Sequence, residues 1–199
     1  MLQKLLSIDI YWLNLLRSLV NPSNHLAVTL VKVLSDFWVF LVIFFLIYLW
    51  LYGVFKKIED SKKAALLIFY SIAFSFLIYV ILNQWFPLRP RPETVTSIKP
   101  LVSHLPDNSF PSGHAIFAGA AILATYLYSE RKYFWTILIF SLIMLVSRVI
   151  AWIHYPSDIL AWLVIWLIWG YAVYKVKDSK CMQKYLIPFP IKIAKYIKL

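Results

Sequence analysis

Two histidines and an aspartate stand in short polar stretches of an otherwise apolar chain. His114 lies in "SFPSGHAIF", and His154 and Asp158 lie in "SRVIAWIHYPSD". A histidine that a carboxylate orients through one ring nitrogen presents the other nitrogen as a nucleophile or base, and a second histidine can protonate a leaving oxygen. These three residues are therefore candidates for nucleophilic and acid–base catalysis.

Two arginines in the polar stretches suit a phosphate-sized anion. Arg91 lies in "NQWFPLRPRPE", and Arg148 follows Ser147 at the start of the stretch that holds His154. The guanidinium group is planar and permanently charged, and its N–H donors match the oxygens of a phosphate. The sequence therefore predicts an anion site beside the candidate catalytic groups.

The start of the apolar run after residue 110 offers further donors. Pro111 fits the first position of a helix, with Ser109 or Asn108 as its N-cap. The first backbone N–H groups of a helix have no partner within it and can bind an anion, and glycine lets the backbone approach closely. The predicted amide donors belong to Ser112, Gly113 and His114.

The composition decides what must position these groups. Of 199 residues, 62% are hydrophobic and only 15% are charged, which is typical of an integral membrane protein. We expect a single membrane-embedded domain over residues 1–199. The net charge of +11 would suggest nucleic acid for a soluble chain, but in a membrane protein it reflects which side of the bilayer each basic residue occupies. No nucleic-acid partner is expected.

Apolar stretches long enough to span a bilayer predict an all-α, polytopic helix bundle with about five transmembrane helices. The predicted spans are residues 37–55, 64–86, 111–128, 133–153 and 159–174. Residues 1–20 are interrupted by charges such as Asp9 and Arg17, which favours an interfacial helix, although six spans are possible. No removable signal peptide is expected there. Lys32 and Asp36 are four residues apart and could pair on one helix face.

The basic residues predict the orientation of the bundle. With five spans, most of the 20 Lys and Arg residues fall on one side, and the positive-inside rule makes that side cytoplasmic. Residues 176–199 form a basic cytoplasmic tail in this topology. The polar stretches then face the outer side. Residues that carry the cytoplasmic charge are Lys56, Lys57, Lys62, Lys63, Arg131, Lys132, Lys175, Lys177, Lys180, Lys184, Lys192, Lys195 and Lys198.

The joint pattern resembles the three-part signature of the type 2 phosphatidic acid phosphatase superfamily. "RP" at residues 91–92, "PSGH" at 111–114, and "SR" followed by His154 and Asp158 at the matching spacing carry the resemblance, which covers about residues 84–158. "RPRP" followed by "SFPSGH" is similar to small bacterial enzymes that act on undecaprenyl diphosphate or on the 1-phosphate of lipid A.

The resemblance implies a role for each matching residue. His154 attacks phosphorus and forms a phosphohistidine, Asp158 orients it, and His114 protonates the departing lipid oxygen and then activates water. Such enzymes need no metal or other cofactor, and the sequence offers no convincing cluster of metal ligands. The phosphoryl oxygens would be held by Arg91, Ser112, Gly113 and Arg148.

One position departs from the family pattern. The family usually has a lysine seven residues before the arginine of the first part, and here that position is Gln84. Glutamine donates hydrogen bonds but brings no charge, and losing one such donor costs about 3 kcal/mol in the transition state. We consider Gln84 and Arg89 as possible additional phosphate-binding residues, with Arg89 replacing the missing cation.

The resulting hypothesis is a lipid phosphatase in a bacterial inner membrane, monomeric, multi-pass, and with its site facing the periplasm or outside. Its partners are the bilayer and a membrane lipid phosphate. The alternatives are a lipid-to-lipid phosphotransferase, a phosphatase of phosphatidylglycerol phosphate or phosphatidic acid, a membrane transporter and a non-catalytic lipid-binding protein. The polar residues gather at one face and not at mid-depth, which speaks against transport.

Trp85, Phe86 and Trp152 lie near the predicted outer interface and are expected to be aromatic-belt anchors. Glu93 and His104 are expected to be solvated loop residues.

Overall fold

Helices make up almost all of the described part of the chain. The computed structural model describes residues 2–85, 89–96, 98–102, 109–110, 112–160, 174–176 and 178–196. Within these ranges, extended pairing is limited to one isolated antiparallel bridge between Arg89 and Phe110. The prediction of an all-α membrane helix bundle is confirmed.

Among the described residues, three helices are long and apolar enough to cross a membrane. They are α2 (His25–Phe55), α3 (Glu59–Trp85) and α6 (Arg131–Ile150), and the shorter α5 (Gly113–Tyr128) is also apolar. These helices match four of the five predicted spans. Most of the fifth, residues 159–174, lies outside the described residues. Only its two ends are described, residues 159–160 in a helical segment at 156–160 and residue 174.

The helix α2 begins earlier than the predicted span. Asn24 is its N-cap, and the Asn24 side chain accepts a hydrogen bond of 3.1 Å from the backbone N–H of Ala27. This contact satisfies one of the free N–H groups at the helix start. Residues 25–36 therefore continue the first span as one helix of 31 residues.

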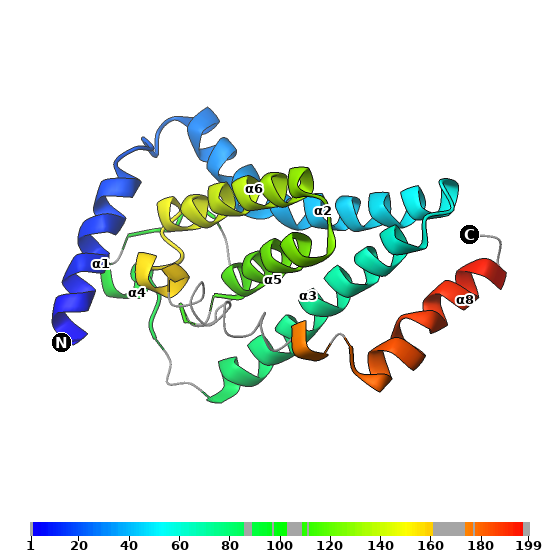
Figure 1. The fold of residues 1–199 in the computed structure, drawn as a ribbon. Helices are drawn as coiled ribbons and strands as arrows, with labels where there is room; N and C mark the ends of the chain where they lie inside the picture. The colour runs from blue at the N-terminus through cyan, green and yellow to red at the C-terminus, as the bar shows by residue number, and fades with distance from the viewer. Residues whose placement is uncertain are drawn as a thin grey trace.

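In the part of the chain that the structure describes, α2, α3, α5 and α6 pack together, with α5 between α3 and α6 (Figure 1). It packs against α3 and α6, and α2 also contacts both of these helices. Small residues let helix backbones approach closely where lipid gives no hydrophobic drive for association. Trp38 of α2 donates a buried hydrogen bond of 2.7 Å to Ser141 of α6. The small buried residues of α5 are Ala115, Ala118, Gly119, Ala120, Ala121 and Ala124.

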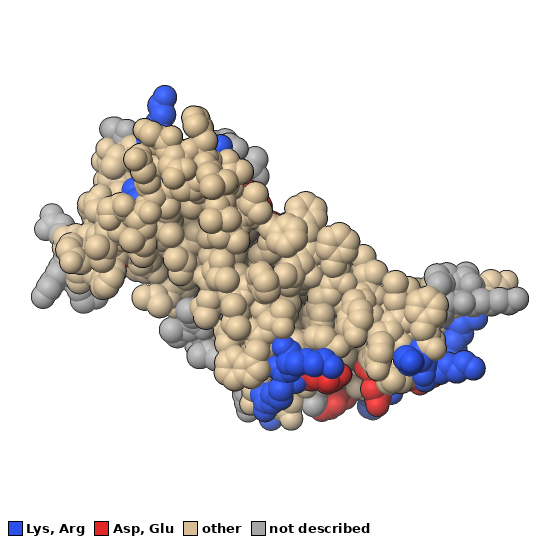
Figure 2. Space-filling view, turned by 90° about the horizontal axis from the view of Figure 1, so that it is seen from above, with Lys and Arg blue, Asp and Glu red and all other residues tan. Residues whose placement is uncertain are grey.

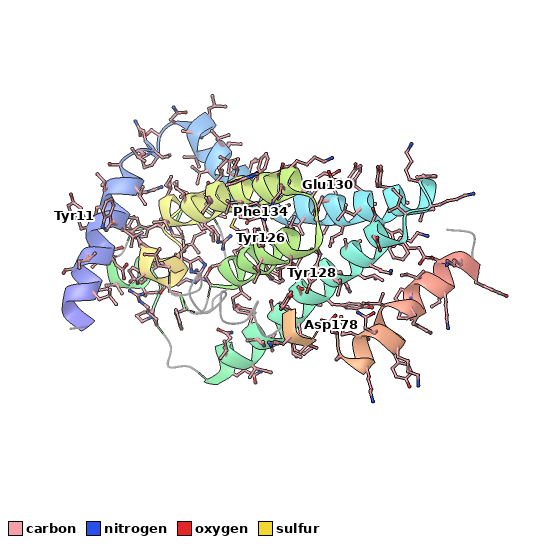
Figure 3. The ribbon with its side chains drawn as sticks, viewed as in Figure 1. Tyr11, Tyr126, Tyr128, Glu130, Phe134 and Asp178 are labelled. Atoms are coloured by element: carbon pink, nitrogen blue, oxygen red, sulfur yellow. The ribbon has the colours of Figure 1, made fainter. Side chains whose placement is uncertain are left out.

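The helix α1 (Leu2–Arg17) runs across one end of the bundle (Figure 1). Leu13 is fully buried in the main core, whereas Tyr11 is 64% exposed and points away from the bundle (Figure 3). The helix therefore has one packed face and one open face. This arrangement is compatible with an interfacial helix, which stays a prediction.

The C-terminal segment packs on the opposite end of the fold. The π-helix η1 (Met182–Leu186) and α8 (Pro188–Tyr196) place Met182, Ile187 and Ile191 against residues of α3. Lys195 also lies 2.6 Å from a carboxylate oxygen of Glu59. The basic tail is therefore at least partly a packed element of the fold.

Basic side chains in Figure 2 gather mainly away from the end that carries α1. The loops between α2 and α3 and between α5 and α6 also lie away from α1 (Figure 1). They carry Lys56, Lys57, Arg131 and Lys132 in or beside them. These basic loops and the described polar stretches are thus at opposite ends of the bundle, and the assignment of the basic end to the cytoplasm stays a prediction.

Candidate active site

The polar stretches converge at the end of the bundle that α1 crosses. Arg91 and Arg148 are each 5% exposed, His154 is 2% exposed and Asp158 is fully buried. Charged side chains are rarely this buried unless they are paired or have a function. The residues come from the segment after α3, the start of α5, the end of α6 and the turn that follows it.

A tight turn after α6 places His154. Trp152 N–H donates to the Val149 carbonyl at 3.0 Å and Ile153 N–H donates to the Arg148 carbonyl at 3.2 Å. These two bonds form a Schellman motif, in which the residue after the C-cap is left-handed and is usually glycine. Here Trp152 holds that position with φ 66°. Surrounding contacts must therefore compensate the strain of about 1–2 kcal/mol.

Burial of Trp152 supplies that compensation. The side chain is fully buried, and its indole Nε1 donates a hydrogen bond of 2.9 Å to Thr96 of α4 (Pro92–Thr96). The prediction that Trp152 is an aromatic-belt anchor is therefore wrong. Indole packing under the turn fixes the backbone that carries His154. The Trp85 side chain, Phe86 and His104 lie outside what the structure describes.

The imidazole of His154 is held from one side. Its Nδ1 lies 2.8 Å from the backbone carbonyl oxygen of Ser109, which can only accept. The proton is therefore on Nδ1, and Nε2 keeps the lone pair that a nucleophile needs. The sequence predicts Ser109 only as a possible helix cap, and its role as a carbonyl acceptor has no sequence signal because every residue carries a carbonyl.

Asp158 acts on His154 indirectly. Its carboxylate accepts from the Ser109 hydroxyl at 2.5 Å, from Arg89 at 2.5 Å and from the Tyr155 N–H at 3.1 Å. The predicted direct contact between Asp158 and His154 is replaced by a path through Ser109. Ser109 links the two residues because its hydroxyl binds the carboxylate while its carbonyl binds the imidazole.

Burial shapes the acid–base behaviour of both groups. Burial lowers the pKa of His154 well below its ordinary value, and the positive charges of Arg148 and Arg91 act in the same direction. Burial raises the pKa of Asp158, while hydrogen bonding by Ser109 and the charge of Arg89 oppose that increase. His154 is therefore unprotonated near neutral pH, as a nucleophile must be.

The helix α5 begins two residues later than predicted. Ser112 is its N-cap, with φ −83° and ψ 108°, and Gly113 is the first helical residue. Pro111 lies outside the described residues. The N-terminal N–H groups of α5 open toward the site end of the bundle. A side chain at Gly113 would meet the Tyr79 ring at 3.3 Å, so glycine allows this close packing.

The Ser112 hydroxyl supports the predicted anion site. It is fully buried and has no hydrogen-bond partner among the described residues, and it does not cap its own helix. Leaving a buried hydroxyl unpaired costs about 1–3 kcal/mol. A phosphate oxygen is a suitable acceptor for this donor.

His114 faces Arg148. Its Nε2 lies 3.2 Å from Arg148 Nη1 and 3.9 Å from an oxygen of Asp36. Because arginine only donates, Nε2 accepts in this contact, and this nitrogen becomes a donor only after His114 takes up a proton. The structure brings His114 and Arg148 together, as the signature predicts.

Asp36 pairs with Arg148, whereas the sequence predicts a pair with Lys32. Its carboxylate lies 3.2 Å from Arg148 and its side chain is 56% exposed. The expected pair with Lys32 is not among the ion pairs of the described residues. The α2–α6 packing brings Asp36 beside a more rigid, buried guanidinium group, which explains the change of partner.

The two arginines of the first stretch have different surroundings. Arg91 donates to the Ile153 carbonyl at 2.8 Å, next to His154. Arg89 instead bridges two carboxylates, with Asp9 at 2.6 Å and Asp158 at 2.5 Å, and stacks over the Tyr155 ring at 3.9 Å. This arrangement does not support Arg89 as a replacement for the missing lysine. Gln84 is exposed near the end of α3 and has no described contact with the site.

Asp9 also lies at the end of the bundle that holds the site, and it is not among the site residues predicted from the sequence. In the sequence it only interrupts an apolar helix, yet in the fold it is 2% exposed. An acidic residue among the apolar residues of an amphipathic helix is the sequence signal that could have identified it. No group of three His, Cys, Asp or Glu residues suited to a metal ion occurs in the described ranges.

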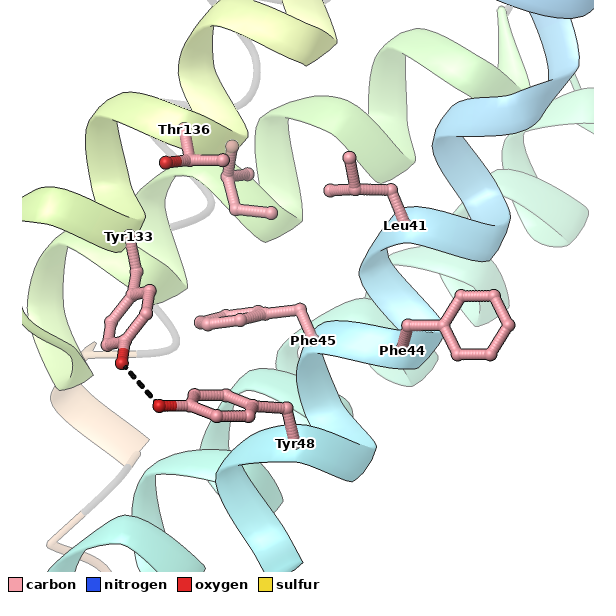
Figure 4. Close-up of a pocket in the computed structure, with 7 residues that line it drawn as sticks. Leu41, Phe44, Phe45, Tyr48, Tyr133 and Thr136 are labelled. Carbon is pink, nitrogen blue, oxygen red and sulfur yellow. Dashed lines mark hydrogen bonds between the residues drawn. The ribbon is translucent and has the colours of Figure 1, made fainter. Parts of the chain in front are cut away.

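An apolar groove of about 290 Å³ lies apart from this site, between α2 and α6 (Figure 4). A hydrogen bond of 2.9 Å between Tyr48 and Tyr133 lies at its edge. None of the predicted site residues lines it, so it is not the candidate active site. Its lining residues are Leu41, Phe44, Phe45, Tyr48, Tyr133, Thr136 and Ile137.

The fold and the site define a helical membrane protein with a buried histidine beside arginines that suit a phosphate group. The chain belongs to the PAP2 superfamily, whose family model matches residues 64–180. This match supports the prediction of a phosphoric ester hydrolase. The comparison does not by itself assign roles to single residues.

Two proteins from Bacillus species are similar to parts of the chain. Undecaprenyl-diphosphatase BcrC of Bacillus subtilis (strain 168) is 30% identical over 133 residues, covering 67% of this chain and 66% of that protein. Bacitracin transport permease protein BcrC of Bacillus licheniformis is 33% identical over 69 residues, covering 34% of this chain and 33% of its own. The chain thus spans just under two thirds of the first relative. No solved structure matches significantly.

Proposed function

We propose that the chain is a metal-independent phosphatase that releases inorganic phosphate from a membrane lipid phosphate or diphosphate. The observation that carries the proposal is the state of His154. Its Nδ1 is held by the Ser109 carbonyl, and its ring is buried near Arg148 and Arg91. A neutral histidine whose Nε2 carries the lone pair, beside two cations, suits nucleophilic attack on phosphorus.

The proposed reaction has two steps. His154 Nε2 forms a bond to phosphorus while the bond to the leaving lipid oxygen breaks, and protonated His114 gives its proton to that oxygen. His114 then takes a proton from water, the water oxygen attacks phosphorus, and the P–N bond to His154 breaks. Charge on the phosphoryl oxygens is met by Arg91, Arg148, Ser112 and the Gly113 amide.

Undecaprenyl diphosphate is the first candidate substrate, because the relative from Bacillus subtilis carries that activity in its name. Lipid A 1-phosphate, phosphatidylglycerol phosphate and phosphatidic acid present the same terminal phosphate and are the alternatives. All four lipids keep their chains in the bilayer. A site at one end of a membrane bundle needs only their head group to reach it.

We also propose that the site faces the outer side of a bacterial inner membrane. The support is the basic loops, which lie at the end of the bundle away from the site. This orientation is tested by adding a substrate whose phosphate head group cannot cross the membrane to right-side-out vesicles and measuring phosphate release. Release only from inverted vesicles would reverse it.

Phosphate release by purified protein in detergent, compared across the four lipids, tests the function. We expect release from at least one of them, a phosphoprotein that is labile in acid and stable in base, and no release by His154→Ala. Full activity of His154→Ala would rule out the mechanism. Mass analysis of the products separates hydrolysis from transfer to a second lipid, because only transfer yields a new lipid phosphate.

Transport is the second function class, and the name of the relative from Bacillus licheniformis, a transport permease protein, favours it. The described charges of the site gather at one end of the bundle, whereas a transport path needs polar groups near mid-depth. We therefore place phosphatase activity first.

A further inference from the structure

A chain of polar contacts connects the N-terminal helix to the proposed nucleophile. Asp9 of α1 lies 2.6 Å from Arg89, Arg89 lies 2.5 Å from Asp158, and Asp158 lies 2.5 Å from the Ser109 hydroxyl. The Ser109 carbonyl then lies 2.8 Å from His154 Nδ1. Every link is within hydrogen-bond distance.

Asp9 and Asp158 bind different nitrogens of the Arg89 guanidinium group. Nη2 contacts Asp9, while Nη1 contacts Asp158 and the Ser157 hydroxyl. The Asp9 side chain is 3% exposed and that of Asp158 is fully buried. A buried charge without a partner is strongly unfavourable, so each carboxylate constrains where Arg89 lies.

Asp9 also holds the residue that precedes Asp158. Its carboxylate accepts from the Ser157 N–H at 3.0 Å and from the Ser157 hydroxyl at 2.5 Å. Asp9 therefore reaches Asp158 by two routes, through Arg89 and through the backbone of Ser157. Both routes end on the carboxylate that fixes Ser109.

We infer that Asp9 is a positioning residue for the proposed phosphoryl transfer. It belongs to α1, a helix outside the region that the family model matches, and it completes the active site. Asp9 lies before residues 64–180, so the matched region alone does not contain it. The inference rests on the proposed function for its kinetic consequence. Independently of that function, we infer that the Asp9 carboxylate keeps the His154 imidazole oriented.

Replacing Asp9 tests the inference kinetically. Asp9→Asn keeps the size and an acceptor oxygen but removes the charge, and we expect kcat to fall about ten-fold or more with KM changed less than about two-fold. Asp9→Glu, which keeps the charge, should retain more activity than Asp9→Asn. Asp60→Asn is the matched control, because Asp60 is 91% exposed and distant in sequence from every site residue.

A double-mutant cycle separates this path from a general folding effect. If Asp9 acts through Asp158 and Ser109, Asp9→Asn should change kcat little in a Ser109→Ala background. Independent, multiplicative losses from the two changes would overturn the inference, as would a rise in KM at constant kcat. Size-exclusion elution and helical circular dichroism identify variants that fail to fold, and Asp9→Glu then replaces Asp9→Asn in the cycle.

A spectroscopic measurement tests the same inference without turnover. In detergent-solubilised protein with ¹⁵N-labelled histidine, His154 is identified by the signals lost in His154→Gln. We expect an Nδ1–H tautomer in the wild type and a changed Nδ1–H signal in Asp9→Asn. An unchanged signal would overturn the inference. Wild-type protein that releases no phosphate from any of the four lipids would overturn the proposed function alone.

Discussion

His154 Nδ1 lies 2.8 Å from the backbone carbonyl oxygen of Ser109, and this one contact sets the tautomer of the proposed nucleophile. The carbonyl can only accept, so the proton stays on Nδ1 and Nε2 is left for phosphorus. Asp158 supports the arrangement from behind Ser109 and does not touch the imidazole. The orienting group is therefore a backbone atom held by a carboxylate.

The state of His154 predicts the pH dependence of the reaction. Because burial and the charges of Arg148 and Arg91 lower the pKa of His154 well below 6.5, its protonation should reduce kcat/KM only well below that pH. Arg148→Gln removes one positive charge, raises the pKa of His154 and should move the acid limb to higher pH. The measurement is kcat/KM against pH for both proteins. An acid limb at the same pH in both would contradict the assignment.

Replacing Arg148, which lies beside His114, and replacing Arg89, which lies beside Asp158, should affect phosphate binding differently. Arg148→Gln is expected to raise the inhibition constant of inorganic phosphate about ten-fold, since a hydrogen bond to a charged group contributes about 1.5 kcal/mol or more. Arg89→Gln should lower kcat while leaving that constant unchanged, because Arg89 binds Asp9 and Asp158. Weaker phosphate binding in Arg89→Gln would restore Arg89 as a phosphate ligand.

Asp36 should oppose the binding of an anion. Its carboxylate lies 3.2 Å from Arg148, where it competes with phosphate for the same guanidinium group. The pair is half exposed and contributes no more than about 1 kcal/mol, so Asp36→Asn should tighten phosphate binding about two- to five-fold. Lys32→Gln on the same helix is the control and should have no effect. Weaker binding in Asp36→Asn would mean that Asp36 mainly orients Arg148.

A stability prediction concerns the turn between α2 and α3. Lys57 has φ 59° in a Schellman motif, where Ile58 N–H donates to the Gly53 carbonyl at 3.0 Å. Lys57→Gly should stabilise the fold by about 1 kcal/mol, because glycine adopts this conformation without strain. Lys56→Gly is the control, since Lys56 is right-handed with φ −87° and should become less stable. The measurement is the midpoint of thermal unfolding of both variants and the wild type in detergent. A midpoint for Lys57→Gly below that of the wild type would refute the prediction.

Much of the candidate site could be found from short local patterns. The run "PSGH" predicts a helix start, and the spacing from Arg148 to His154 and Asp158 is visible in the sequence. The predicted N-cap, Ser109 or Asn108, is wrong, because a serine also stands at 112 and can cap a helix equally well. The structure gives Ser112 that position and leaves Ser109 to hold His154.

The sequence by itself determined the membrane bundle and the family signature, because span length, basic loops and motif spacing are properties of neighbouring residues. Only the tertiary structure decided which carboxylate meets which arginine. Asp9 and Asp36 lie 80 and 112 residues from Arg89 and Arg148, and nothing local marks them as partners. Any buried acid could neutralise either arginine, so the pairing follows from how α1 and α2 pack against the site end of the bundle.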